Sequence, residues 1–126
     1  MYAGQLNQVF MNILSNALDA LEERGARLSA DQLRENPSII SIKTEIPKPD
    51  RVLIRISDNG LGMTKTVCNR LFDPFFTTKP VGKGTGMGLS ISYQIVTDRH
   101  KGSLKCTSSP GQGAEFAIEI PLKAIC

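Results

Sequence analysis

The stretch "RVLIRISDNGLGM", residues 51–63, decides the fold that we expect for this chain. Val52, Ile54 and Ile56 recur at every second position, which predicts a strand with one apolar face. By the same period of two, Asp58 lies on that face. A carboxylate that continues a buried face costs free energy unless a partner satisfies it. Asp58 is therefore a candidate functional residue.

The segment that begins at Asp58 allows two interpretations. Asp-Asn-Gly is a favoured hairpin turn, but a hairpin requires a returning strand. The following "LGMTKTVCNRLF" is instead typical of a helix capped by Thr64. The other interpretation is a pocket floor. There Gly60 and Gly62 let the backbone approach a ligand closely, and Asp58 accepts a hydrogen bond from a group such as an adenine amino group.

The flanking segments predict an α+β fold. Residues 5–23 carry apolar residues at steps of three and four, which predicts an amphipathic helix that ends near Gly25. Further expected elements are a short helix at 29–36 with a Ser29–Gln32 capping box, a strand at 38–46 joined to 51–58 by a turn at "PKPD", a helix at 88–100, and a hairpin at 103–122 around "PGQG". We expect a two-layer α/β sandwich, a mixed and mostly antiparallel sheet with helices on one face.

Glycine occupies every second position from Gly82 to Gly88, directly before the expected helix at 88–100. A helix that opens after such a loop offers free backbone N–H groups and its positive dipole end to a phosphate. The spacing fits neither the P-loop nor the Rossmann fingerprint. A flexible linker is the alternative interpretation.

Asn12 and Asn16 stand one turn apart on the polar face of the first expected helix. A solvated face is the usual explanation for such a pair. Asparagine is a poor helix former, however, and its amide oxygen can bind Mg²⁺, which takes few protein ligands beside water and substrate phosphates. The residues alone leave both interpretations open.

Composition argues against several classes of protein. The 126 residues are 40% hydrophobic and contain no apolar run long enough for a membrane span and no secretory leader. Three cysteines, Cys68, Cys106 and Cys126, form no CxxC pair, which indicates reduced thiols in the cytoplasm. The net charge of +3 is dispersed, so we expect no nucleic-acid partner and no membrane insertion by this segment, although the parent protein can be membrane-anchored.

Four ordered motifs resemble the ATP-binding catalytic domain of sensor histidine kinases, in the superfamily that includes gyrase, the heat-shock chaperone and MutL. They are "NQVFMNILSNALDAL" (7–21) for the N box, "DNGLGM" (58–63) for the first glycine box, "LFDPFFTTK" (71–79) for the F box and "GKGTGMGLS" (82–90) for the second glycine box. The segment "SSPGQGAEFAIEIPL" (108–122) resembles the closing hairpin of that domain. The order and spacing match over essentially the whole chain.

The resemblance implies a role for each matching residue. Asp58 would receive the adenine amino group, Asn16 would hold Mg²⁺, and a flexible lid from about residue 73 to 86 would cover ATP. The implied catalytic residues are Asn12, Asn16 and Lys79, and the implied metal ligand is Asn16. The implied ATP-binding residues are Asn16, Asp19, Ala20, Asp58, Gly60, Gly62, Met63, Lys83, Gly84, Thr85, Gly86, Met87, Gly88 and Leu89.

The implied function is histidine kinase catalysis in two-component signal transduction. The domain would bind Mg-ATP and donate the γ-phosphoryl group to a histidine on a separate dimerisation and phosphoacceptor domain. Relatives that hydrolyse ATP carry glutamate where Asn12 stands, and an amide cannot accept a proton at neutral pH. His100 falls at an expected helix end, so we expect a structural role for it. We expect one domain, residues 1–126, from a longer kinase whose phosphoacceptor hairpin is absent here.

Some positions depart from the family pattern. Asp19 stands where many members have lysine, Ala114 stands where serine or threonine is frequent, and residues 25–36 resemble an insertion without an assigned role. The alternatives are an ATP-binding regulatory module without transfer activity, an anti-sigma-type serine kinase, and a clamp ATPase of the gyrase or MutL type. The implied partners are the phosphoacceptor domain of the parent kinase and a downstream response regulator receiver domain.

Overall fold

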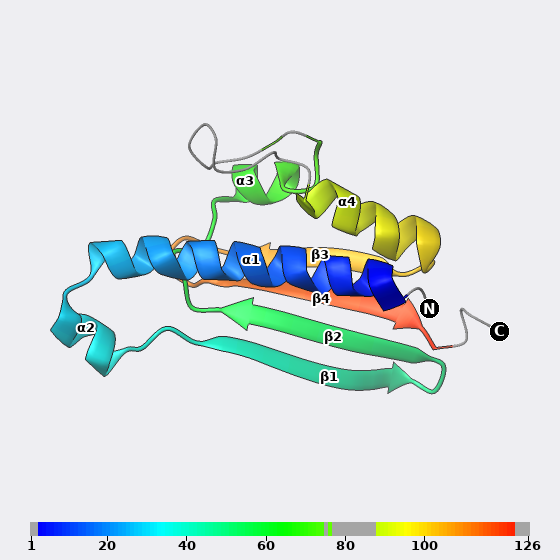
Figure 1. Cartoon of the computed structure of the whole chain (residues 1–126), viewed down its shortest axis with the longest axis horizontal. Coiled ribbons are helices and arrows are strands. Elements are labelled where there is room, and N and C mark those ends of the chain that lie inside the picture. Colours follow the sequence, from blue (N-terminus) through cyan, green and yellow to red (C-terminus); the bar gives the residue numbers. More distant parts are fainter. Residues whose placement is uncertain (1–2, 75, 77–87, 123–126) are drawn as a thin grey trace.

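A computed structural model of the chain describes residues 3–74, 76 and 88–122 (Figure 1). The helices are α1 (Ala3–Arg27), α2 (Ala30–Glu35), α3 (Lys65–Arg70) and α4 (Gly88–Gln94), and α4 continues into the π-helical turn η1 (Ile95–Arg99). The strands are β1 (Ile40–Lys48), β2 (Arg51–Asp58), β3 (Ser103–Ser108) and β4 (Ala114–Pro121). No helix among these residues is long and apolar enough to cross a membrane.

The four strands form one sheet in the order β1-β2-β4-β3, and each described pairing is antiparallel. In Figure 1 the helices α1, α3 and α4 lie on one side of this sheet, and α2 lies beyond its end. This arrangement confirms the α+β sandwich predicted from the sequence. The register pairs Ile56 with Phe116 and Asp58 with Ala114, which fixes where the carboxylate at the end of β2 lies.

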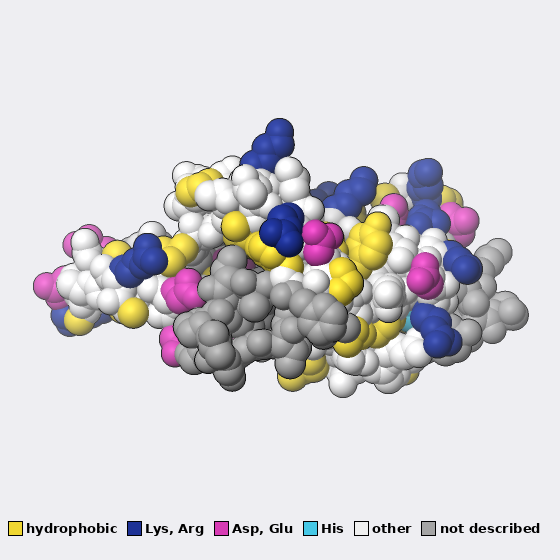
Figure 2. Space-filling view, turned by 90° about the horizontal axis from the view of Figure 1, so that it is seen from above, with side chains coloured by type: hydrophobic (Ala, Val, Ile, Leu, Met, Phe, Trp, Pro, Cys, Tyr) yellow, Lys and Arg dark blue, Asp and Glu magenta, His cyan; other side chains and the backbone are white. Residues whose placement is uncertain are grey.

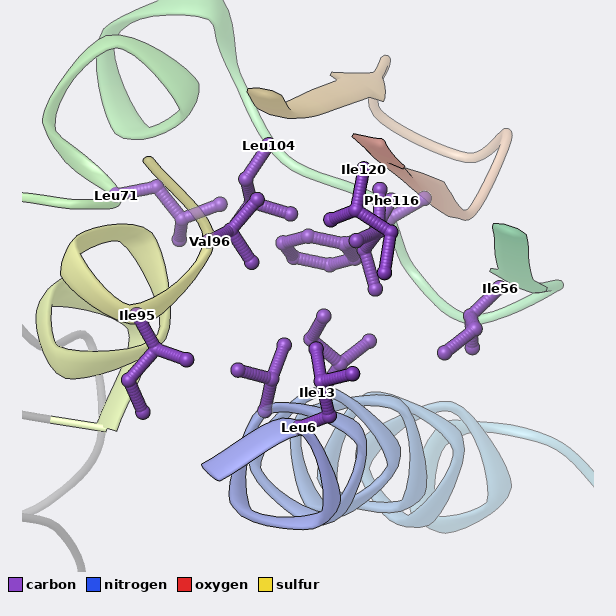
Figure 3. Packing of buried hydrophobic residues seen from close by; sticks show 12 residues of the cluster. Leu6, Ile13, Ile56, Leu71, Ile95, Val96, Leu104, Phe116 and Ile120 are labelled. Carbon is purple, nitrogen blue, oxygen red and sulfur yellow. The ribbon is translucent and has the colours of Figure 1, made fainter. Parts of the chain in front are cut away.

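The core lies between α1, the helix α4–η1 and the covered face of the sheet. Figure 3 shows Leu6 and Ile13 of α1 pointing toward Phe116 and Ile120 of β4. Strand β4 alternates strictly between buried and half-buried positions, as its sequence pattern predicts. The buried apolar residues are Leu6, Val9, Ile13, Ile56, Leu71, Ile95, Val96, Leu104, Ala114, Phe116, Ile118 and Ile120.

The other face of the sheet is polar. Arg55 of β2 lies between the neighbouring strands, with its guanidinium 3.1 Å from Glu45 of β1 and 2.9 Å from Glu115 of β4. These three side chains are each more than a third exposed, so the ion pairs add little stability. Figure 2 shows a different side of the molecule, the one on which α3 and α4 lie in Figure 1, and there Lys and Arg side chains are dispersed among Asp and Glu side chains, as the sequence suggests.

Two predicted boundaries were wrong. Helix α1 passes through Gly25 and ends at Arg27. A glycine inside a helix costs only about 1 kcal/mol relative to alanine. The Arg24 side chain also binds Asn36 and Ser38, which follow the helix in the sequence. Strand β1 continues into the predicted turn at residues 47–50 and ends at Lys48, which pairs with Arg51. Strand β1 is an edge strand with an irregular register between Glu45 and Lys48, and an edge position tolerates the proline within that segment.

The predicted helix starts at Ser29 and Thr64 are confirmed. The Ser29 hydroxyl accepts a hydrogen bond from the Gln32 backbone N–H at 3.1 Å, and the Gln32 side chain accepts one from the Ser29 backbone N–H at 2.8 Å. This is the reciprocal capping box that the sequence indicates. The Thr64 hydroxyl caps α3 by accepting from the Val67 backbone N–H at 3.3 Å.

The predicted helix at 88–100 is confirmed, except that its last turn is π-helical. The turn ends at His100, which is fully buried, with its Nδ1 3.0 Å from the carbonyl oxygen of Ile95. The widened turn directs Ile95 and Val96 into the core. This placement agrees with the structural role expected for His100.

Candidate functional site

Asp58 ends β2 at the edge of the core, and only 9% of its surface is exposed. One carboxylate oxygen accepts a hydrogen bond from the backbone N–H of Gly60 at 2.8 Å. The backbone of Ala114, the partner of Asp58 on β4, also donates to the carboxylate. The segment after Asp58 leads into α3 rather than back into a hairpin strand. Of the two interpretations of Asp-Asn-Gly, the structure therefore excludes the hairpin turn.

Gly60 brings the loop after β2 against helix α1. A Cβ atom at this position would lie 2.8 Å from the Cβ of Ala20 and 2.8 Å from Oδ1 of Asp58. Real Cβ atoms do not approach other atoms so closely, so only glycine fits between the helix and the carboxylate. The structure thus brings together Ala20, Asp58 and Gly60, three of the residues predicted for one site.

Burial raises the pKa of the Asp58 carboxyl above its ordinary value. Desolvation is the larger effect, and the hydrogen bonds from the backbones of Gly60 and Ala114 oppose it. The hydrogen bonds orient the carboxylate, but they do not fully offset the free energy that its negative charge loses on removal from water. Such a carboxylate gains free energy when a hydrogen-bond donor from a ligand reaches it.

We expect this raised pKa to appear in the pH dependence of stability. Because the folded-state pKa exceeds that of the unfolded chain, the folded state holds the proton more tightly, and stability falls as the pH rises between the two values. Asparagine at position 58 carries no titrating group. The free energy of unfolding of the wild type minus that of Asp58→Asn should therefore be level below about pH 4 and decrease as the pH rises through the folded-state pKa. Urea titrations at several pH values measure this difference, and a difference that increases with pH would contradict the assignment.

Asn12 joins α1 to the start of α4. Its Nδ2 atom donates to the Gly88 carbonyl at 3.0 Å and lies 3.1 Å from the Ser92 hydroxyl, which itself donates to the Gly88 carbonyl at 2.8 Å. A carbonyl oxygen only accepts, so the contact fixes which end of the Asn12 amide faces Gly88. Asn12 is therefore not on a purely solvated face. Its side chain links two helices, and its predicted role beside the phosphates stays a prediction.

The remaining predicted residues lie along the same elements. Asn16 and Asp19 are half-buried on α1, one turn and two turns after Asn12, and Leu89 packs against the core at the start of α4. Met63 donates its backbone N–H to the Ser108 hydroxyl at 2.9 Å, and Gly62 lies against the Ser109 carbonyl. Lys79, Lys83, Gly84, Thr85, Gly86 and Met87 lie outside the described residues.

Ser92 was not among the residues predicted from the sequence, although its side chain is fully buried against Asn12. Serine at this position follows Gly88 by four residues, a spacing at which a helical hydroxyl bonds the preceding turn. The spacing alone therefore predicts a hydrogen bond from Ser92 to Gly88. It does not predict that Ser92 also contacts Asn12 of α1.

The donor set on α1 suits magnesium better than a transition metal. Nowhere in residues 3–74, 76 and 88–122 do three His, Cys, Asp or Glu side chains gather as a metal site. An amide oxygen such as that of Asn16 is a hard ligand, and Mg²⁺ accepts one or two protein oxygens together with water and phosphate oxygens. The residues present therefore fit a magnesium ion that a phosphorylated ligand brings with it.

Several known proteins are similar in sequence to almost the whole of this chain. Sensor kinase CckA of Brucella abortus is 39% identical over 121 residues, covering 94% of this chain and 12% of its own. Sporulation kinase E of Bacillus subtilis is 37% identical, covering 94% and 14%, and signal transduction histidine-protein kinase AtoS of Escherichia coli is 38% identical, covering 93% and 17%. The chain thus spans less than a fifth of the length of these relatives.

Solved structures share the fold. The catalytic domain of histidine kinase ThkA is 29% identical with a TM-score of 0.71, covering 94% of this chain and 67% of its own. Full-length ShkA, solved in complex with AMPPNP, is 25% identical with a TM-score of 0.73, covering 94% and 21%. The sequence profile of the histidine kinase-, DNA gyrase B- and HSP90-like ATPases matches residues 2–124. Because this match includes nearly every residue, the chain belongs to that ATPase family.

Proposed function

We propose that this chain is the ATP-binding catalytic domain of a sensor histidine kinase. It binds Mg-ATP and donates the γ-phosphoryl group to a histidine of a separate dimerisation and phosphoacceptor domain. The observation that carries the proposal is the convergence of Asp58, Gly60 and Ala20, a buried acceptor beside a surface kept free of side chains. The sensor-kinase names of the relatives and the nucleotide analogue in the ShkA structure support it.

Asp58 supplies the specificity for the base. One of its oxygens accepts the Gly60 N–H, and a carboxylate has further lone pairs for a second donor. The adenine amino group is such a donor, whereas guanine presents a carbonyl oxygen at the equivalent position of its ring. A carboxylate facing that oxygen would be repelled. Asp58 therefore favours adenine over guanine nucleotides.

Asn16 is the residue that would hold Mg²⁺, with phosphate and water oxygens as the other ligands. When bound, the ion neutralises charge on the phosphates during phosphoryl transfer. The chain itself positions the ligand, because α1 carries Asn12, Asn16 and Ala20 along one side at spacings of four residues. This row extends from the contact with Gly88 to the contact with Gly60.

Asn12 favours transfer over hydrolysis. Its amide nitrogen is held on the Gly88 carbonyl, so the group at this position is a fixed donor and not a base. A neutral amide cannot remove a proton from water at neutral pH. Water near the γ-phosphate then remains a poor nucleophile, and the phosphoryl group is retained for an imidazole from a partner domain.

Phosphotransfer from labelled ATP tests the proposal. Mixed with a separate histidine hairpin domain, the chain should label its histidine in an acid-labile, alkali-stable form, and a receiver domain of a response regulator should then remove the label. ATP binding without any transfer would instead indicate a regulatory module. A label on serine would indicate an anti-sigma-type kinase, and fast ATP turnover by the isolated chain would indicate a clamp ATPase.

We also place the domain in the cytoplasm, from the reduced thiols indicated by its cysteine pattern.

Replacing Asn16 with Ala should remove the dependence of ATP affinity on magnesium. In the wild type, Mg²⁺ should tighten ATP binding, and in Asn16→Ala the affinity with Mg²⁺ should fall by about tenfold, toward the value without it. Asn7→Ala, at an exposed position of the same helix, is the matched control and should bind as the wild type does. Calorimetry with and without Mg²⁺ measures both. An unaltered magnesium effect in a folded Asn16→Ala variant would exclude Asn16 as the ligand.

A further inference from the structure

A cavity of about 390 Å³ lies at the end of α1, in the region that resembles an insertion. Helix α1 contributes Arg24 and Arg27, and the segment that follows it contributes Leu28 and Asn36. Leu61 and Gln112 contribute from the loop after β2 and from the turn between β3 and β4. The volume is in the range of small-molecule sites.

Arg24 is a buried cation without an anionic partner among the described residues. Only 7% of its surface is exposed, and its guanidinium donates to the carbonyl oxygen of Asn36 at 2.6 Å and to the Ser38 hydroxyl at 3.5 Å. Both acceptors are neutral. Within the described ranges no carboxylate lies within ion-pair distance of Arg24, although a buried charge normally requires an opposite charge. Two of its five N–H donors are used, which leaves others for a ligand.

The rest of the lining has the same electrostatic character. Arg27 is exposed at the cavity and, like Arg24, makes no ion pair with any described residue. The side-chain amides of Asn36 and Gln112 make no hydrogen bond in the part of the chain that the structure describes, so their donors are available. None of the lining residues is Asp or Glu. Leu28 and Leu61, both half-buried, add apolar surface.

This cavity is distinct from the site around Asp58. The two share Gly60, but the lining of the cavity contains none of Asn12, Asn16, Ala20 and Asp58. Asn59, which lines the cavity, is held in place by its own side chain, which accepts from the Ile39 backbone N–H at 2.8 Å and donates to the Pro37 carbonyl at 2.9 Å. This part of the cavity lining is therefore fixed by hydrogen bonds.

We propose that this cavity binds a small organic anion. The oxyanion group, a phosphate or a carboxylate, would pair with the guanidinium groups of Arg24 and Arg27, whose planar donors match oxyanion geometry. The apolar part of the ligand would lie against Leu28 and Leu61. The site does not depend on occupation of the nucleotide site.

Titration of the isotope-labelled chain with phenyl phosphate, benzoate and inorganic phosphate, followed by amide NMR, tests the proposal. Phenyl phosphate or benzoate should shift the amides of Arg27, Leu61 and Gln112 in a saturable manner, with a Kd of about 1 mM or tighter, and more tightly than inorganic phosphate. The better of the two organic probes shows whether phosphate or carboxylate is preferred. Arg27→Gln should weaken this binding about tenfold or more, because a charge-assisted contact is lost. Arg99→Gln, another exposed arginine in the last turn of a helix, should leave it unchanged.

Several results would overturn the proposal. They are shifts that do not saturate, equal binding of inorganic phosphate and the organic probes, or a Kd that Arg27→Gln does not alter. Displacement of the probe by Mg-ATP would also overturn it, because the cavity would then be part of the nucleotide site. If ATP failed to bind while the probe still saturated these amides, the proposed kinase function would fail and the anion site would stand.

Discussion

Replacing Asp58 with Asn is expected to weaken Mg-ATP binding about ten- to hundredfold, which corresponds to a loss of about 1.5–3 kcal/mol for one charge-assisted hydrogen bond. Asparagine retains the shape of the Asp58 side chain but has only one oxygen. The N–H groups of Gly60 and Ala114 both require an acceptor, and the adenine amino group is a third donor. In the variant, the side-chain NH2 group of asparagine would point at one or more of these donors instead of accepting from them. The acceptor for the adenine amino group is therefore lost. Calorimetric titration with Mg-ATP measures the change.

The control for this experiment is Asp50→Asn, which removes a carboxylate from the exposed turn between β1 and β2. It changes the net charge by the same amount but should bind ATP as the wild type does. Circular dichroism and urea unfolding must show that Asp58→Asn is folded. A folded Asp58→Asn variant with wild-type affinity would show that the base is not recognised at this carboxylate.

Replacing Gly113 with Ala is expected to destabilise the domain by about 2–5 kcal/mol. Gly113 has a φ of 71°, and a Cβ there would lie 2.0 Å from the carbonyl oxygen of Asp58. The positive φ costs a residue with a side chain about 1–2 kcal/mol, and forcing the strands apart adds about 1–3 kcal/mol. The clash would also move Ala114 away from the Asp58 carboxylate, so nucleotide affinity should fall together with stability.

Gly111→Ala separates the two contributions. Gly111 has a φ of 79°, but a Cβ at that position would meet nothing within 4 Å. The free energy of unfolding of this variant should fall by only about 1–2 kcal/mol, the cost of a positive φ, and its nucleotide affinity should not change. Urea unfolding of the two variants measures the difference. Equal losses at the two positions would mean that Gly113 is not held against Asp58.

The sequence predicted the parts of the fold that depend on local pattern. The alternation in residues 51–58 and 114–121 follows directly from one buried face per strand, and the capping box at Ser29 involves residues three apart. The end of α1 was missed because it depends on Arg24 reaching Asn36 and Ser38, contacts that the helical pattern does not include. The π-helical turn was missed for a similar reason, since it serves the packing of Ile95 and Val96.

The site divides in the same way. Asp58 could be singled out because its polarity breaks an apolar pattern, and its glycine neighbours are visible beside it. Asn12 and Asn16 drew notice as a pair of poor helix formers, but only the resemblance favoured a functional role for them over a solvated helix face. Ser92 and the cavity at Arg24 depend on which elements meet in space, and no single segment reveals them. The roles of Lys79 and of residues 83–87 stay predictions.

The central claim is that adenine is recognised by the buried carboxylate of Asp58. A crystal structure of the chain with Mg²⁺ and a non-hydrolysable ATP analogue tests it most directly. We predict that the adenine amino nitrogen lies about 2.7–3.2 Å from a carboxylate oxygen of Asp58, with the base beside Ala20 and Gly60. A base bound elsewhere, with Asp58 paired only to the backbone of Gly60 and Ala114, would contradict the claim.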